Sequence, residues 1–492
     1  MVFPIAGGTQ STGYDVSNSL RFHDGDSPDL RLALGSSPSG SNTNATFSFW
    51  IKRSEFDDQQ ILYNHYVDAN NYFRINLRAI DAGTAPSGLE IVNIVGGSDA
   101  GSRMTNFRFR DSHAWYHIVV STDSDNSTED DRVKLYINGT RYTDWASTAT
   151  WATTFKHFAD NATVYIGTRE GSSQYFDGYL SEVNVIDGTE YDATAFGEFN
   201  DNGVWIPKQY TGGYGNNGHF LEFKQTGTGT ASASTIGADT SGNDKHFTST
   251  NLSSFDVTVD TCTNNFATIS NLYGDKQQGG AITFKEGNCQ ITTSYVDANY
   301  QRYPMAYSSM AVSKGKWYFE MKPISGNVYN IGVFSPEDFA SDSTTNPYGG
   351  YAATGVIYTE GGVVRQNDTQ DTGHATYDDS DIVGCALDMD NNAVYFHKNN
   401  TYINSGNPTS GASKTGAFTL PTTGSNGTDI TLYGFTCGDE GAADIGTMQI
   451  NFGNPPYAPS SIETDGNGRG SFEYAPPSGY LALCTKNLGS NG

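Results

Sequence analysis

The stretch Arg132-Val133-Lys134-Leu135-Tyr136-Ile137-Asn138-Gly139-Thr140-Arg141-Tyr142 decides the fold class. Its first part, VKLYI at 133–137, alternates aliphatic side chains with polar or aromatic ones, and this period of two predicts a β-strand. Asn138-Gly139 is a residue pair that tolerates the positive φ angles of a two-residue hairpin turn. The chain then returns as TRY at 140–142. The stretch therefore predicts a β-hairpin, and we expect antiparallel sheets around it.

Runs of the same kind recur along the chain on both sides of this hairpin. Gly, Asn and Asp separate them, which is typical of all-β domains. The segments that we predict as strands are residues 46–52, 114–121, 163–167, 176–183, 316–322, 385–389, 393–396 and 448–453, with further candidates at 220–223 and 254–259. An aromatic share of 13% and 56 Gly also favour strands and turns over helices.

The length and the strand pattern together predict two domains. A chain of 492 residues exceeds what a single core usually supports. We expect an N-terminal arm at residues 1–18, a first β-sandwich at 19–208, a structured Gly/Thr/Ser-rich connector at 209–260, a second β-sandwich at 261–488 and a tail at 489–492. The predicted fold is all-β, with two antiparallel sandwiches in tandem.

The net charge argues against several classes of partner. Lys and Arg total 28 against 54 Asp and Glu, which gives a formal charge of -26. Such a field repels phosphate, so we expect neither nucleic acid nor an anionic membrane as a partner. No apolar run reaches transmembrane length, and the start of the chain lacks the basic and apolar regions of a signal peptide. We therefore expect synthesis in a cytoplasm and no membrane insertion.

The cysteines give no sign of a zinc site, because no Cys-x-x-Cys pair occurs. The five cysteines are Cys262, Cys289, Cys385, Cys437 and Cys484. Their odd number and wide spacing argue against a complete disulfide framework. We expect them to be small buried thiols.

The carboxylates do not form a pattern that predicts catalysis. A retaining glycosidase needs two carboxyl groups about 5 Å apart, which on one strand means acidic residues at alternating positions. Glu182 and Asp187 are too far apart on a strand, whereas Asp388 and Asp390 run directly into a hairpin turn. We predict no catalytic residue and no enzymatic activity.

The acidic segment from Asp123 to Asp131 does not match a calcium loop. An EF-hand requires Gly at its sixth position and Glu at its twelfth, where this chain has Thr128 and Lys134. We expect a solvated acidic loop, no metal ligand set and no cofactor. A calcium site built from scattered loop oxygens stays open, although the sequence does not locate one. His117 lies within an apolar run, so we expect it to be a core residue with satisfied hydrogen bonds.

Aromatic residues in loops are the candidate binding residues, because sugars stack on exposed rings. Trp145 and Trp151 flank the small polar stretch 146–150. Tyr348 and Tyr351 bracket Gly349-Gly350. The alternative is that each ring caps the core or an interface with a neighbouring subunit.

Two parts of the chain resemble known families. Residues 18–200 resemble the laminin-G/concanavalin A-like lectin family, through the residues at 48–52, 115–117, 133–139, 166–167 and 176–183. Residues 262–486 resemble a SPRY domain, through the residues at 315–320, 384–390, 394–396 and 450–453. Since a SPRY domain is itself a concanavalin-like sandwich, the resemblance implies two concanavalin A-like antiparallel β-sandwich (jelly-roll) domains in tandem.

A further resemblance concerns the source of the chain. Residues 8–14, leading to 18–22, and residues 474–480 resemble structural proteins of marine, cyanophage-like tailed phages, in which a lectin-like half and a SPRY-like half occur together. This resemblance implies a virion protein made in the host cytoplasm and displayed on the particle surface. Its implied partners are other virion proteins and host cell-surface glycans, and display on a symmetric particle favours a homo-oligomer.

The sequence thus leads to a hypothesis with two alternatives. We expect a phage virion surface protein, either a tail appendage or fibre component or a head decoration, that binds glycan or protein without catalysis. One alternative is a polysaccharide depolymerase of concanavalin-like fold. The other is a purely architectural capsid-decoration protein without a ligand. The sequence shows neither repeats nor heptads, which weakens the version with a long fibre.

Overall fold

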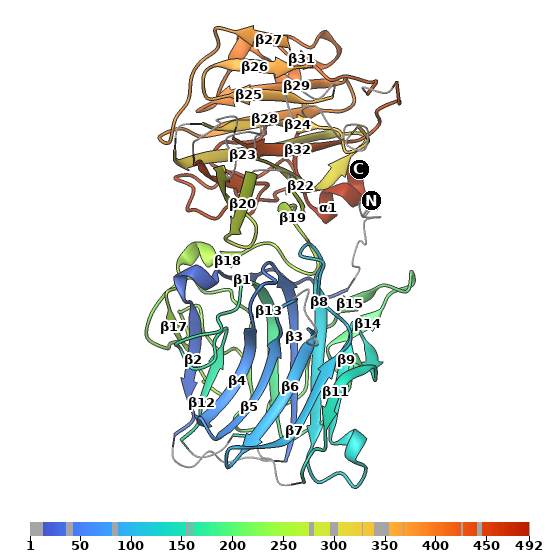
Figure 1. Ribbon diagram of the computed structural model, residues 1–492, viewed down its shortest axis with the longest axis vertical. Coiled ribbons are helices and arrows are strands. Elements are labelled where there is room, and N and C mark those ends of the chain that lie inside the picture. The colour runs from blue at the N-terminus through green and yellow to red at the C-terminus, as the bar shows by residue number, and fades with distance from the viewer. Residues whose placement is uncertain are drawn as a thin grey trace. The chain divides into compact units, whose positions relative to one another are not determined.

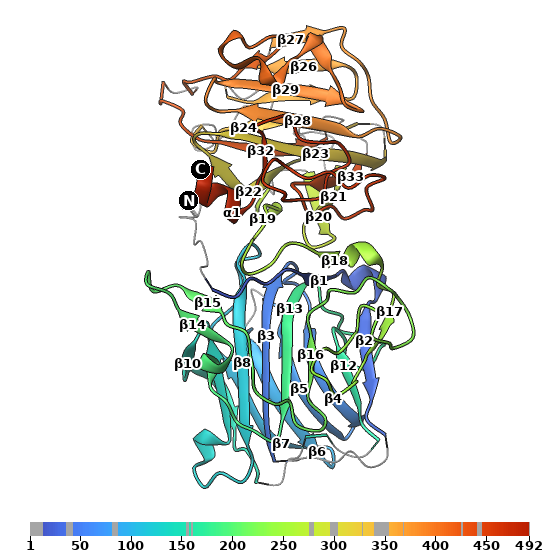
Figure 2. The ribbon, with the colours of Figure 1, turned by 180° about the vertical axis from the view of Figure 1, so that it is seen from behind.

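A computed structural model of the chain gives two compact units, residues 11–264 and 265–492 (Figures 1 and 2). The residues that it describes are 13–35, 43–80, 87–153, 157–158, 161–274, 280–295, 304–326, 328–338, 354–367, 369–424, 427–439 and 445–491. Each unit is built from antiparallel β-sheets, so the fold is all-β, as predicted. Within the described part of the chain, no helix has the length and apolar character that crossing a membrane requires.

The first unit is a sandwich of two sheets. One sheet has the order β10 (Thr140–Tyr142), β9 (Val133–Ile137), β8 (Tyr116–Asp123), β3 (Asn44–Arg53), β13 (Gly178–Asp187), β1 (Ser19–Phe22) and β18 (Val257–Thr258), and β16 (His219–Leu221) also pairs with β13. The other has the order β11 (Trp145–Ala149), β7 (Ser98–Thr105), β6 (Leu89–Val95), β5 (Asn71–Leu77), β4 (Gln60–Asp68), β12 (Thr163–Ile166), β2 (Asp29–Ala33) and β17 (Thr248–Thr250). We call them the covered sheet and the second sheet.

The hairpin predicted for residues 133–142 forms in the structure. β9 pairs with β10, and Thr140 lies opposite Ile137. The turn residues Asn138 and Gly139 have φ angles of 47° and 80°, which are the left-handed values that a tight hairpin requires. The inner faces of the two sheets enclose a core of aliphatic and aromatic side chains, among them Phe47 and Phe73, whose rings stack with centroids 5.2 Å apart.

The outer face of the covered sheet is buried by the chain that follows β13. The short strands β14 (Gly197–Phe199) and β15 (Trp205–Pro207) form a separate pair, and Trp205 and Phe196 pack on Trp50 and Val119 of the sheet. His117 lies in this second core with its ring stacked on Trp50 at 4.8 Å. It accepts a hydrogen bond from Trp205 Nε1 at 3.0 Å and bonds Ser48 Oγ at 2.9 Å, so the prediction of a satisfied core histidine is confirmed.

Residues 209–260, which we expected to connect the domains, belong to the first unit. They supply β16, β17 and β18, which pair with β13, β2 and β1. Ser254–Asp256 is a 3-10 turn rather than part of a strand, and its start is capped by reciprocal bonds between Ser253 and Asp256. The candidate strands at 220–223 and 254–259 correspond in part to β16 and β18, whereas β17, with three residues, was not predicted.

The second unit is also a sandwich. One sheet has the order β19 (Ile269–Gly274), β22 (Met305–Val312), β32 (Tyr433–Gly438), β24 (Asn330–Phe334), β25 (Val356–Thr359), β26 (Val363–Gln366) and β27 (Thr369–Thr372). The other has the order β20 (Gly280–Lys285), β21 (Gln290–Tyr295), β33 (Thr447–Asn451), β23 (Lys316–Ser325), β28 (Val383–Asp388), β29 (Ala393–Lys398) and β30 (Thr401–Tyr402), while β31 (Phe418–Thr419) pairs with β29 and β34 (Leu481–Ala482) with β23. The short helix α1 (Thr485–Asn491) follows β34. Trp317, Phe319 and Met321 of β23 all enter the core, as their alternation predicts.

The cysteines in the structure are free thiols. Cys289, Cys385, Cys437 and Cys484 are buried, as expected, whereas Cys262 is half-buried against the aromatic cluster that covers the first unit's sheet.

Candidate functional site

The outer face of the second sheet carries a row of side chains from five neighbouring strands. The strand register places Arg31 of β2 opposite Tyr165 of β12, Tyr165 opposite Asn64 of β4, Asn64 opposite Arg74 of β5, and Arg74 opposite Val92 of β6. Phe73 and Ile75 point into the core, so Tyr72, Arg74 and Asn76 lie on the outer side. We call this surface, with Arg78 and Arg169 beside it, the arginine face.

Arg74 is the central residue of the arginine face. It is 8% exposed, and its guanidinium lies over the ring of Tyr72, with Cζ 4.9 Å from the ring centroid. Its Nε has no hydrogen-bond partner, and among the described residues no carboxylate lies within ion-pair distance of its guanidinium. Burial lowers the pKa of Arg74, Tyr72 and Glu90 act in the opposite direction, and the like charges of Arg169 and Arg78 lower the pKa further. Among the described residues, the face therefore holds a buried cation without an ion pair, on which Glu90 acts only from beyond ion-pair distance.

The carboxylates near the arginine face have other partners. Glu90 Oε2 accepts from Asn76 Nδ2 at 3.1 Å and lies 3.6 Å from Arg78 Nη1. Asp29 binds Arg31 through both oxygens, at 2.8 and 2.6 Å. The positive charge at Arg74 thus stays available to a ligand.

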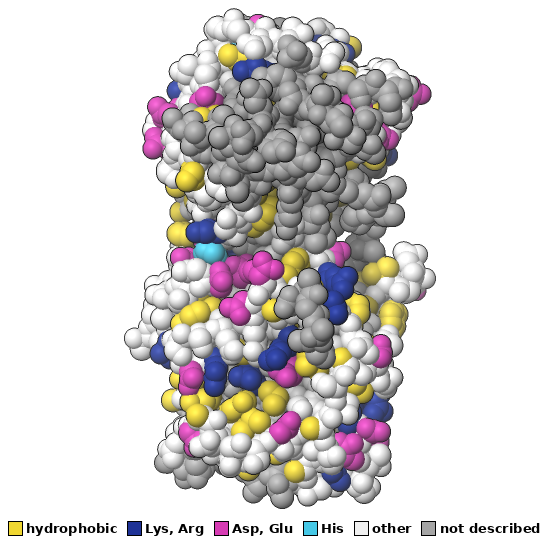
Figure 3. Space-filling model, viewed as in Figure 1, with side chains coloured by type: hydrophobic (Ala, Val, Ile, Leu, Met, Phe, Trp, Pro, Cys, Tyr) yellow, Lys and Arg dark blue, Asp and Glu magenta, His cyan; other side chains and the backbone are white. Residues whose placement is uncertain are grey.

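The arginine face also carries aromatic rings and, beneath them, buried amide groups. The rings of Tyr66 and Tyr165 meet edge to face with centroids 6.4 Å apart, and Arg31 lies 5.9 Å from the Tyr165 centroid. Asn64 donates its amide to the carbonyl of Arg169, but the Oδ1 atoms of Asn64 and Asn76 are buried without a hydrogen-bond partner. Figure 3 shows Lys and Arg side chains, in dark blue, beside hydrophobic ones over the strands that Figure 1 labels β2, β4 and β5. Partly exposed rings next to a cation together suit a sugar chain.

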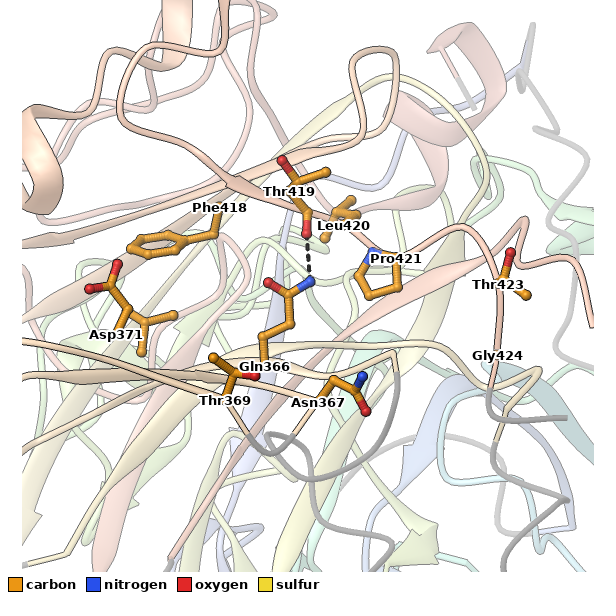
Figure 4. Close-up of a pocket in the computed structure, with 11 residues that line it drawn as sticks. Gln366, Asn367, Thr369, Asp371, Phe418, Thr419, Leu420, Pro421, Thr423 and Gly424 are labelled. Carbon is orange, nitrogen blue, oxygen red and sulfur yellow. Dashed lines mark hydrogen bonds between the residues drawn. The ribbon is translucent and has the colours of Figure 1, made fainter. Parts of the chain in front are cut away.

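The second unit has a groove at the edge of its sandwich (Figure 4), with a volume of about 840 Å³. It lies between the β26–β27 hairpin and the segment after β31, and Gln366 Nε2 spans it to the carbonyl of Thr419 at 2.8 Å. The groove is lined by Val364, Gln366, Asn367, Thr369, Asp371, Phe418, Thr419, Leu420, Pro421, Thr423 and Gly424. A second hollow of about 730 Å³ shares Asp371 with it and extends along β30. Polar and apolar groups line both hollows in similar proportion, so the lining does not favour one class of ligand.

The predicted binding aromatics lie in different environments. Trp151 is fully buried in the core of the first unit, where it packs against Gly101 and cannot stack on a ligand. Trp145 is half-buried at the start of β11, with Arg103 5.4 Å above its ring and Tyr142 at its edge. Tyr348 and Tyr351 lie outside the described residues. The two tryptophans therefore do not form a joint platform.

The acidic loop after β8 is held by arginines. Arg103 Nη2 lies 3.4 Å from Glu129 and 3.1 Å from Asp130, while Arg141 binds Asp131 at 2.7 Å. These ion pairs account for the run of carboxylates.

A different cluster has the composition of a cation site. His23 Nδ1 lies 3.0 Å from Asp177 Oδ2 and 3.6 Å from Asp24 Oδ1, and the ligand atoms of all three residues lie within 4.8 Å of one another. Burial raises the pKa of Asp177 to about 6. Its oxygen already accepts from the His23 ring and from the Asp24 amide, at 3.0 and 3.4 Å. The cluster is satisfied within the chain, and it lies in the loops around β1 where sequence reasoning located no ligand.

Two glutamates have strongly perturbed carboxyl groups. Glu182 lies at a β-bulge of β13 with a φ of 52°, and burial, before any other cause, raises its pKa to about 7. Tyr14 donates to it at 3.2 Å. Asp187 has separate partners, since both nitrogens of Asn217 donate to it, at 3.0 and 2.9 Å. The two carboxylates do not act as a pair.

Glu320 of β23, in the second unit, is the other glutamate with a strongly perturbed carboxyl group. Burial raises its pKa to about 7. Its oxygens accept from Tyr318 Oη at 3.0 Å, Asn451 Nδ2 at 3.1 Å and the amides of Glu473 and Tyr474 at 2.9 and 2.8 Å. These bonds fix the segment that returns across the sheet, so Glu320 has a structural role.

Comparisons with known proteins agree with the fold of the first unit. Residues 24–193 match the family described as the concanavalin A-like lectin/glucanases superfamily, which is about a third of the chain. The first unit therefore carries a laminin-G/concanavalin A-like lectin domain, as the resemblance implied. No curated protein matches the chain in sequence.

Solved structures with partial similarity include a SPRY domain. The SPRY domain of human HERC1 is 12% identical, with 37% of this chain and 96% of that chain covered and a TM-score of 0.26. Domain 4 of the arabinanase AbnA from Geobacillus stearothermophilus, in complex with arabinotriose, is 18% identical, with 32% and 67% covered and a TM-score of 0.24. A heptameric SAP-like pentraxin from Limulus polyphemus is 17% identical, with 36% and 80% covered and a TM-score of 0.26.

Sequence reasoning missed the arginine face, although a signal for it exists. In Asn71-Tyr72-Phe73-Arg74-Ile75-Asn76-Leu77 the apolar residues alternate with polar ones, which places Tyr72, Arg74 and Asn76 on one side of a strand. The strand partners of β5 could not be read from this pattern, because Asn64 and Val92 come from other segments.

Proposed function

We propose that the chain is a glycan-binding surface protein and that it performs no catalysis. The carrying observation is the arginine face, where partly exposed tyrosine rings and a guanidinium lie on one side of a lectin-like sandwich. Sugars bind such surfaces because rings contact their C–H faces while amides and guanidinium groups bond their hydroxyls. Two further supports are the match of residues 24–193 to a lectin family and the separate partners of Glu182 and Asp187.

A glycan array with the purified full chain tests this proposal. We expect binding to a subset of glycans, and we expect Tyr72→Ala and Tyr165→Ala each to weaken that binding by about threefold to tenfold, since a ring contact contributes about 0.5–1.5 kcal/mol. Phe199→Ala is the matched control, because Phe199 is an exposed aromatic on a different strand pair of the same unit. If the wild-type chain binds no glycan on the array, the proposal of glycan binding is contradicted and an architectural role is favoured.

We further propose that the chain is displayed on a phage particle, as an appendage component or a head decoration. The support is the resemblance of residues 8–14 and 474–480 to virion proteins. Quantitative mass spectrometry of purified particles tests it. A few copies per particle indicate an appendage, and a ratio near that of the capsid lattice indicates a decoration. Absence from the particle rules out both.

One observation favours the depolymerase as a second candidate. Glu182 combines a positive φ, burial and a pKa of about 7, which are features of a general acid, and Glu222 is close enough to contribute to that pKa. If the chain is a depolymerase, the purified protein should release reducing ends from a polysaccharide, and Glu182→Gln should abolish the release. Binding without release favours the non-catalytic proposal.

A further inference from the structure

We propose that the arginine face binds an anionic polysaccharide, with Arg74 as the residue that receives a sulfate or carboxylate group of the sugar chain. This inference rests on the proposed glycan binding and specifies its ligand class. It starts from the state of Arg74, which is 8% exposed, has an Nε without a hydrogen-bond partner and has no ion pair within the described residues. A buried charge without a partner is costly, so an anion that docks there gains more than it would at an exposed arginine.

The surroundings of Arg74 strengthen the local positive charge. Arg78 and Arg169 act on Arg74 as like charges. Arg169 is half-exposed and has only a loose pair, 3.7 Å from Glu170. Glu90 is the nearby acid, and Asn76 and Arg78 engage it. A sulfate or carboxylate above Arg74 therefore meets a cluster of guanidinium groups.

The neighbouring groups select a sugar rather than any anion. Tyr72 lies beneath the Arg74 guanidinium, and the Tyr66 and Tyr165 rings lie one and two strands away. These partly exposed rings can contact the C–H face of a sugar, a contact that a phosphodiester backbone does not offer, whereas Asn64 and Asn76 are buried. The ligand must therefore present an anionic group next to a sugar ring that contacts the tyrosines.

The net charge of -26 does not oppose this site. At physiological ionic strength, exposed charges are screened beyond about 8 Å, so the distant acidic surface has little effect at Arg74. The same acidic surface disfavours long polyanions that contact the protein elsewhere, which favours a ligand that fits the face in a few sugar units.

The test compares three polymers in a binding assay at 150 mM salt: a sulfated galactan, its chemically desulfated form and a polyuronate. We expect at least one anionic polymer to bind about tenfold or more tightly than the desulfated galactan. Arg74→Gln should weaken anionic binding by about tenfold to a hundredfold, as expected for hydrogen bonds to a charged group, and leave binding of the neutral form unchanged. Arg74→Lys should retain part of the preference.

Matched controls keep the result interpretable. Arg110→Gln removes an exposed arginine of the same unit and should change affinity by less than twofold. Thermal unfolding should show that Arg74→Gln folds, because Arg74 has no ion pair to lose.

The outcomes separate this inference from the proposed function. Equal binding of the sulfated and desulfated polymers overturns the anionic ligand but supports glycan binding. If Arg74→Gln binds the anionic polymers as tightly as the wild-type chain does, the binding site lies elsewhere and the proposed role of Arg74 is wrong. Comparable binding of a DNA oligonucleotide overturns the selection for sugars. Silence toward every polymer contradicts both proposals. Tighter binding of the sulfated galactan identifies a sulfate as the group that Arg74 receives, and tighter binding of the polyuronate identifies a carboxylate.

Discussion

Lys52 and Asp260 form an ion pair with side chains 1% and 0% exposed, and the Nζ–Oδ2 distance is 2.7 Å. Trp115 Nε1 donates to the other oxygen of Asp260 at 3.1 Å, and Tyr179 lies 5.2 Å from Nζ. Desolvation of two charges offsets much of their attraction, but loss of one partner leaves the other buried and unpaired. The pair joins β3 to the segment that ends the first unit.

Lys52→Met should therefore destabilise the chain by about 3–5 kcal/mol. The control is Lys224→Met, which breaks the exposed pair between Lys224 and Glu222 and should cost less than about 1 kcal/mol. Urea unfolding followed by fluorescence measures both. If the two variants lose the same stability, the buried pair has no special weight.

Individual residues show where sequence reasoning reaches its limit. His117 was predictable as a core residue because its apolar neighbours give its burial. Trp151 was not predictable as one, because it is buried against Gly101 of β7, a strand about 50 residues earlier in the chain. The lack of an ion pair at Arg74 was even less accessible, since it depends on which acids lie on four neighbouring strands.

At the scale of elements, the hairpin of β9 and β10 shows how local pattern and packing combine. Gly139 has a φ of 80°, and a Cβ at this position would lie 2.2 Å from Cε3 of Trp205. Gly35 also has a φ of 80°, but a Cβ there would meet nothing within 4 Å. The two glycines thus share the backbone requirement and differ only in packing.

We predict that Gly139→Ala destabilises the chain more than Gly35→Ala. The alanine at 35 should cost about 1–2 kcal/mol, because a side chain in the left-handed region is strained. The alanine at 139 adds the displacement of Trp205, which bonds His117, so its cost should be higher by a further 1–3 kcal/mol or so, typical of overpacking. Chemical unfolding of both variants checks the difference. Equal costs would show that Trp205 moves freely.

The strands that could be predicted were those with uninterrupted patterns. β3, β8, β9, β13, β23, β28 and β29 follow apolar or alternating runs that are read directly from the sequence. β4 was missed because buried polar residues such as Asn64 interrupt its apolar pattern, whereas β5 was missed although its alternation is regular. Asn64 belongs to the arginine face, so in β4 a residue of the candidate site obscured the strand.

At the scale of the whole molecule, buried ionisable groups make stability depend on pH. Burial lowers the pKa of five histidines, to about 4 for His65 and His219 and about 3 for His117, His157 and His397. Each contributes stability above the ordinary value of 6.5 that is lost as pH falls. Asp177, Glu182 and Glu320 have raised pKa values and act oppositely, since their contribution is present at low pH and lost as pH rises to about 6–7.

Burial raises the pKa of Glu55 as well, but five histidines outweigh these four carboxyls, so the free energy of unfolding should fall between pH 6.5 and 4.5. Urea midpoints at the two pH values measure this. Glu320→Gln removes one opposing group and should make the fall steeper. A rise in stability on acidification would contradict the assignment of neutral buried histidines.

The two ends of the first unit lie side by side. β1 pairs with β18, Ser19 lies opposite Thr258, and their hydroxyls are 2.7 Å apart. Val16 accepts at its carbonyl from Thr261 Oγ1 at 2.9 Å. A module whose entry and exit are adjacent can be inserted into a surface loop of a host protein without separating the host's flanking strands. We therefore expect residues 13–264 to keep their fold when they are inserted as a unit into another protein. We also expect the sandwich to stay intact when circular permutation places new chain ends in an exposed turn.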